Sequence, residues 1–132
     1  MQGSVTNVLI VDDSPIVSER LKEMLNEMKN VKVVGHAATA ASALEKIWTL
    51  HPDYVILDIQ MSGLSGIYVL EKMKKFPPIP KVIILTNYPF PHFKNACLSA
   101  GADYFFDKSK DFEKIAGVFA ESGISTPSVS PI

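Results

Sequence analysis

The sequence predicts a doubly wound α/β fold, a (βα)5 three-layer sandwich built on a five-stranded parallel sheet. Five short apolar runs alternate with five segments of helical periodicity, an alternation typical of right-handed βαβ units. The run Tyr54–Leu57 is apolar throughout, as expected of a parallel strand that is buried on both faces. Four of the five runs end at an acid, a threonine or a lysine, which would place reactive side chains at one edge of the sheet.

Length and composition are those of one ordinary globular domain. With 132 residues, of which 47% are hydrophobic and 20% charged, the chain can bury a substantial core. A net charge of -1 gives no general attraction to nucleic acid or to a membrane surface, so we expect direct binding to neither. A single cysteine, no signal-peptide pattern and no apolar segment near the ~20 residues of a membrane span predict a cytoplasmic protein.

The five strands are assigned to the apolar runs, which are rich in β-branched or aromatic residues. In chain order these runs cover residues 8–11, 31–35, 54–57, 81–85 and 104–106. The second run alternates more than the others and ends without an acid, so we expect it at an edge of the sheet, away from the reactive strand ends. That placement favours the strand order 2-1-3-4-5.

The five helices are assigned to segments whose apolar residues recur every three or four positions. These segments cover residues 15 to about 29, 40–50, 67–73, 93–100 and 112–119. Ser14 and Thr39 can cap the first two helices, and Pro15 suits a first helical turn. Gly101 can close the fourth helix at its C′ position, and the prolines from Pro77 onward end the third.

The strand ends carry groups that suit one kind of chemistry. These groups are Asp12 and Asp13, Asp58, Thr86, and Lys108. Three carboxylates that meet would repel one another without a cation, and oxygen ligands in a cytosol favour Mg2+. Lys108 and the hydroxyl of Thr86 could then face a phosphoryl group, with Asp58 as the nucleophile. The set therefore predicts a phosphoryl-transfer site.

Each of these residues also has an ordinary interpretation when it is taken alone. The acidic pair could be a solvated turn before a helix, Asp58 could start a turn, and Thr86 could simply end a strand. Lys108 could lie on the surface. Their common position, at the same end of separate βα units, is what favours function. Structural or surface roles are expected for the remaining candidates: His36, His51, His92, Trp48 and Cys97.

Taken together, these motifs resemble the receiver domain of bacterial two-component response regulators, the CheY-like family, over residues 5–122. The resemblance rests on VDDS at 11–14, DIQMSGLSG at 58–66, LT at 85–86, and GAD at 101–103 with the lysine at 108. It implies a flavodoxin-like sheet and a phosphoryl group transferred to Asp58 from a histidine kinase or a phosphotransfer protein. It also implies Mg2+ held by Asp13, Asp58 and the backbone carbonyl of Gln60, with Asp12 assisting through water.

The resemblance further implies a switch and an output surface. Thr86 and Lys108 would contact the phosphoryl oxygens, and Phe105 would be the switch aromatic. Partner proteins, or a second copy of the chain in a homodimer, would bind the surface formed by the fourth helix, the fifth strand and the fifth helix. As a receiver, the chain would not be an enzyme beyond accepting and hydrolysing its own phosphoryl group.

Several positions depart from the family pattern. Ser62 and Ser109 stand where family members often have proline, the second usually with a cis bond. Asn87 and Tyr88 follow the switch threonine, where a small residue is usual, and this predicts an atypical autodephosphorylation rate. Phe105 lacks a hydroxyl, so the switch cannot depend on a tyrosine hydrogen bond.

Other functions on the same architecture stay open. A docking module that works without phosphorylation would need none of the acids. A Mg-dependent phosphohydrolase usually places its nucleophile and acid two residues apart and carries a cap domain, whereas here the acids are adjacent. A flavin or nucleotide module would need a phosphate-binding loop after the first strand, where two aspartates would repel phosphate.

We assign residues 1–122 to the receiver-like domain. Residues 123–132 are rich in Ser and Pro and lack periodicity, which predicts a flexible tail or the start of a linker. No DNA-binding or other effector pattern follows residue 122. The chain is therefore expected either to signal by docking or to be part of a longer regulator.

Overall fold

The computed structural model describes residues 5–60, 66–87 and 90–123. Its five strands form one parallel sheet in the order β2-β1-β3-β4-β5, which confirms the predicted fold class and strand order. The strands are β1 (Thr6–Val11), β2 (Val31–Ala37), β3 (Tyr54–Leu57), β4 (Lys81–Thr86) and β5 (Tyr104–Asp107). The helices are α1 (Pro15–Asn26), α2 (Ala40–Leu50), α3 (Gly66–Met73), α4 (Pro91–Ser99) and α5 (Lys114–Gly123).

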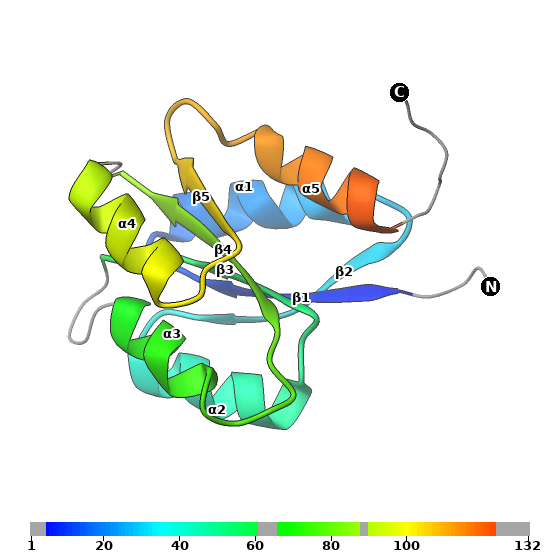
Figure 1. Cartoon of the computed structure of the whole chain (residues 1–132). Coiled ribbons are helices and arrows are strands. Elements are labelled where there is room, and N and C mark those ends of the chain that lie inside the picture. Colours follow the sequence, from blue (N-terminus) through cyan, green and yellow to red (C-terminus); the bar gives the residue numbers. More distant parts are fainter. Residues whose placement is uncertain (1–4, 61–65, 88–89, 124–132) are drawn as a thin grey trace.

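Helices cover both faces of the sheet (Figure 1). Val8 and Ile10 of β1 pack with α1 and α5, whereas Leu9 and Val11 pack on the opposite side with α2, α3 and α4. This alternation follows from the two-residue period of a strand. Cys97 of α4 is fully buried in the second cluster, as expected. Since both faces are covered, the strand ends are where polar groups can meet.

Several helix ends lie where local sequence signals predict them. Ser14 caps α1 by accepting the N–H of Val17 at 3.3 Å, and Thr39 caps α2 by accepting the N–H of Ser42 at 3.1 Å. Gly101 follows α4 with a φ of 109°, a left-handed conformation that favours glycine. None of the helices in the described ranges combines the length and the apolar character that a bilayer crossing requires.

Two helix boundaries differ from the predicted ones. The first helix ends at Asn26 rather than near residue 29, and the N–H of Met28 donates to Leu25 in a tighter turn at 3.0 Å. Met28 still packs against the core, so the apolar spacing continues beyond the end of the helix. The last helix begins at Lys114 rather than at residue 112, and the buried Phe112 lies in the turn that precedes it. This helix includes residue 123, and residues 124–132 lie outside the described part of the chain.

Candidate functional site

The carboxyl ends of β1 and β3 bring acids side by side. Val11 and Leu57 are partners in the parallel register, and the next residues are Asp12 and Asp58. The N–H of Asp58 donates to the carbonyl of Val11 at 3.0 Å, which extends the pairing by one residue. Carboxylate oxygens of Asp12, Asp13 and Asp58 all lie within 4.8 Å of one another. The convergence of acids expected from the sequence is therefore present.

Lys108 reaches this cluster from the end of β5. Its Nζ lies 2.9 Å from Oδ2 of Asp12 and 3.1 Å from Oδ2 of Asp58, and its side chain is 9% exposed. Its backbone N–H donates to the carbonyl of Thr86 at 2.8 Å. Burial alone would lower the pKa of Lys108, but the hydrogen bonds and charges of the two aspartates outweigh it and raise the pKa. The ammonium group is thus a fixed cation between two carboxylates.

Asp58 is almost completely buried at the centre of the sheet edge. Burial raises the pKa of Asp58 above its ordinary value, and the charge of Asp12 adds to this effect. Two effects lower the pKa of Asp58 without cancelling this rise. One is the hydrogen bond that the N–H of Gln60 donates to Oδ1 at 3.0 Å, and the other is the charge of Lys108. A cation placed beside Asp58 would therefore stabilise its ionised form.

Thr86 and Phe105 lie on β4 and β5, the two strands that follow β3 in the sheet order. Thr86 is the last residue of β4, is fully buried, and pairs with Asp107 of β5. Phe105 is half-buried and packs against the cluster under α2, α3 and α4. Asn87 is exposed directly after Thr86. Tyr88 lies outside the described residues.

Gly66 allows the chain to return close to the end of β3. A Cβ atom at this position would lie 2.3 Å from the carbonyl oxygen of Asp58 and 2.8 Å from Cα of Ile59. The N–H of Gly66 donates to the carbonyl of Ile59 at 3.1 Å. The predicted turn glycine thus contributes to the position of Asp58 itself. Residues 61–65, including Ser62, lie outside the described part of the chain.

The bond after Lys108 is trans, since the cis bond of the described ranges lies between Pro77 and Pro78. The loop is held by Asp107, whose Oδ1 accepts the N–H of Ser109 at 2.8 Å. The serine that replaces the family's proline is thus accommodated without a cis peptide.

The second strand contributes a residue that the sequence analysis did not assign to the site. β2 extends two residues beyond the predicted end, through His36 to Ala37, and pairs along the whole of β1. Nε2 of His36 lies 2.9 Å from the backbone oxygen of Asp12, and the N–H of Asp12 donates to the carbonyl of Ala37 at 2.9 Å. The expectation that this strand ends away from the acids is wrong. The predicted order, which places β2 beside β1, was the signal that could have revealed the contact.

The donor set fits a hard divalent cation such as Mg2+. The clustered groups are all carboxylates, and the exposed Asp13 opens the cluster to solvent. Mg2+ prefers oxygen ligands, retains several waters and is usually bound through one or two carboxylates. Asp12, Asp13 and Asp58 can supply these ligands. Gln60 lies two residues after Asp58, beyond the end of β3.

Comparison with known proteins agrees with the geometry. The family model for the response regulator receiver domain matches residues 8–119. A protein-glutamate methylesterase/protein-glutamine glutaminase of Methanospirillum hungatei is 31% identical over 116 residues, which are 86% of this chain and 34% of that protein. The chain thus spans about a third of that relative's length.

Solved structures show the same likeness. The response regulator domain of Thermotoga maritima CheB is 32% identical with a TM-score of 0.79, over 89% of this chain and 92% of that one. A chain of the CheX-CheY-BeF3-Mg2+ complex of Borrelia burgdorferi is 28% identical with a TM-score of 0.77, over 89% of this chain and 92% of that one. Sequence and fold together place the chain in the family of response regulator receiver domains.

Proposed function

We propose that this chain is a phosphoacceptor receiver, in which Asp58 takes a phosphoryl group from a phosphohistidine of a histidine kinase or phosphotransfer protein. The observation that carries the proposal is the buried carboxylate of Asp58, which lies within 4.8 Å of two further acids and 3.1 Å from Lys108. Such a set of acids and one lysine suits phosphoryl transfer, which depends on positioning and charge stabilisation. Simple docking would not require a buried carboxylate beside two further acids.

In the proposed reaction, a carboxylate oxygen of Asp58 forms a bond to phosphorus. The bond between phosphorus and the imidazole nitrogen of the donor breaks, and the imidazole keeps the electron pair and gains a proton from solvent. Later hydrolysis forms a bond between a water oxygen and phosphorus, and the bond from phosphorus to Asp58 breaks. The products are inorganic phosphate and the free carboxylate.

Asp13, Asp58 and the backbone carbonyl of Gln60 would hold Mg2+, with Asp12 assisting through water. When bound, the ion neutralises charge on the acids and on the transferring phosphoryl group. The chain's own residues would position the phosphoryl group. Lys108 has three N–H donors, so it can keep its contact with Asp12 while another donor turns from Asp58 to a phosphoryl oxygen. Thr86 would donate its hydroxyl from the end of β4.

Phosphorylation would then alter the α4-β5-α5 surface. A phosphoryl group adds about -1.5 to -2 charges and new acceptor oxygens beside Thr86 and Lys108. If Thr86 moves toward them, the half-buried Phe105 can fill the vacated space. Among the described residues of α4 only Cys97 is buried, which makes this helix easy to shift. Partner proteins or a second copy of the chain would bind this surface.

Phosphotransfer from acetyl phosphate tests the proposal. Wild-type protein should gain the mass of one phosphoryl group in the presence of Mg2+ and none after chelation. Asp58→Asn, a matched variant without the nucleophile, should gain none under either condition. Equal labelling of both proteins would reject Asp58 as the acceptor, and no labelling of a folded wild type would favour the docking module.

A further inference from the structure

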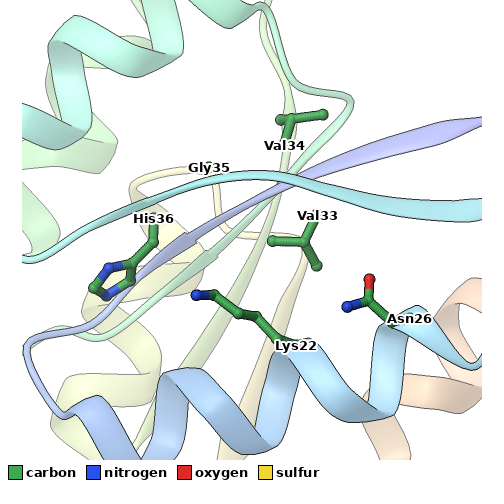
Figure 2. A pocket seen from close by; sticks show the side chains of 6 residues that line it. All are labelled: Lys22, Asn26, Val33, Val34, Gly35 and His36. Atoms are coloured by element: carbon green, nitrogen blue, oxygen red, sulfur yellow. The ribbon is translucent and has the colours of Figure 1, made fainter.

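His36 lies in a groove between α1 and the edge strand β2. Figure 2 shows its ring beside Lys22 of α1, in a pocket of about 330 Å³ that Asn26 also lines. A hydrogen bond holds the ring in this groove, because its Nε2 lies 2.9 Å from the backbone oxygen of Asp12. A carbonyl oxygen only accepts hydrogen bonds, so Nε2 must carry the proton.

The backbone around His36 is itself held in place. Its carbonyl oxygen accepts a hydrogen bond from Nζ of Lys46 on α2, and its Cα is paired with Ile10 in the β1–β2 register. The histidine therefore projects from a fixed point of the edge strand. Its contact with Asp12 can transmit that rigidity to the end of β1.

Asp12 is bound through every polar group that it has. Its backbone N–H donates to Ala37, its Oδ1 accepts the N–H of Ser14 at 2.8 Å, and its Oδ2 pairs with Lys108. Its carbonyl, held by His36, belongs to the peptide group that joins Asp12 to Asp13. Rotation of this peptide would turn the exposed Asp13 away from the other acids, and the His36 bond opposes that rotation.

We infer that His36 is a positioning residue for the acidic cluster: by holding the peptide between Asp12 and Asp13, it sets the direction of the Asp13 carboxylate toward Mg2+. The inference rests on the proposed function, since it assigns His36 to the metal-dependent phosphorylation of Asp58. Residues that orient metal ligands typically change metal affinity by about 10- to 100-fold when they are replaced.

The test compares three variants with the wild type. His36→Phe keeps a planar aromatic ring but removes the donor, and His36→Gln restores an N–H donor on a side chain of similar reach. Lys22→Met is the matched control, because Lys22 lines the same groove and its ion pair is with the exposed Glu19. Circular dichroism and thermal unfolding first establish that each variant is folded.

Calorimetric titration with Mg2+, without a phosphodonor, gives the main readout. We expect about tenfold weaker binding for His36→Phe, partial recovery for His36→Gln and wild-type binding for Lys22→Met. Phosphorylation by acetyl phosphate should reach the wild-type rate in His36→Phe once Mg2+ is raised to saturation. The inference alone is overturned if the wild type binds Mg2+ and is phosphorylated, but a folded His36→Phe binds Mg2+ as tightly as the wild type does. A wild type that neither binds Mg2+ nor is phosphorylated overturns the proposed function.

An NMR measurement on the wild type does not depend on any variant. At a pH where an imidazole is neutral, the ring nitrogen shifts of His36 should report the Nε2–H tautomer. The Nδ1–H tautomer would contradict the hydrogen bond to Asp12 and with it the inference, even if His36→Phe fails to fold.

Discussion

At the scale of single residues, the site depends on one lysine between two buried carboxylates. Lys108 contacts both Asp12 and Asp58, and all three side chains are less than 10% exposed. A buried carboxylate is tolerated only when it is paired, because its desolvation is otherwise uncompensated. Lys108 therefore stabilises the fold as well as the proposed chemistry.

Replacement of Lys108 by alanine should expose this dependence. Without the ammonium group, Asp12 and Asp58 are left buried and repel each other, so we expect a loss of about 3 kcal/mol in the free energy of unfolding without Mg2+. Saturating Mg2+ should restore part of the loss. Urea unfolding with and without the ion measures both effects, and unchanged stability in Mg2+-free buffer would contradict the pairing.

The buried Asp58 predicts a pH dependence of stability. Burial raises the pKa of Asp58 above the ordinary value of 3.8, so the folded state holds this proton more tightly than the unfolded state. The slope of stability against pH is then negative: stability falls as pH rises from 3.8 through the folded pKa. Asp58→Asn lacks the group, so in Mg2+-free buffer the wild type should lose stability relative to it across that window. A pH-independent difference in urea unfolding would contradict this.

At the scale of elements, the turn from β3 to α3 places the nucleophile. Gly66→Ala would bring a methyl group against the Asp58 carbonyl, and backbone atoms cannot move aside as a flexible side chain can. We expect a loss of about 1–3 kcal/mol in stability and weaker Mg2+ binding. Gly117 of α5, with nothing within 4 Å of an added Cβ, offers the matched control. Gly117→Ala should be neutral or stabilising, and equal effects of the two changes would argue against the close approach.

The reactivity of the Cys97 thiol can report on the position of helix α4. Burial raises the pKa of the Cys97 thiol to about 11, so at neutral pH the thiol is protonated and enclosed. A thiol reagent should therefore react slowly with native protein and fast with unfolded protein. If phosphorylation shifts α4, a phosphate mimic with Mg2+ should change the native rate. A native rate equal to the unfolded one would contradict the burial.

At the scale of the whole molecule, a parallel sheet explains how separate βα units build one site. All neighbouring strands are parallel, so the residues after β1, β3 and β5 and the last residue of β4 meet at one edge of the sheet. The strands could be predicted from the sequence because uninterrupted apolar runs mark strands that are buried on both faces. The meeting of the acids could be predicted because the ends of parallel strands lie at one edge of the sheet. The chain spans about a third of the length of its methylesterase/glutaminase relative.

The remaining features depended on contacts that no local pattern records. The last apolar residue of the predicted first helix, Met28, packs on the core from a turn and so concealed the helix end. The polar and small residues of β2 concealed its extension to Ala37, which is stabilised by pairing with Val11. His36 was missed for the same reason, since only the extended strand brings it to Asp12.

The most direct test of the central claim is to locate the phosphoryl group chemically. After phosphorylation with acetyl phosphate and Mg2+, borohydride reduction converts an aspartyl phosphate to homoserine, which tandem mass spectrometry places in the sequence. We predict homoserine at position 58 with Mg2+ and none after chelation. Homoserine at position 12 or 13, or at no position in folded protein, would contradict the assignment of Asp58 as the phosphoacceptor.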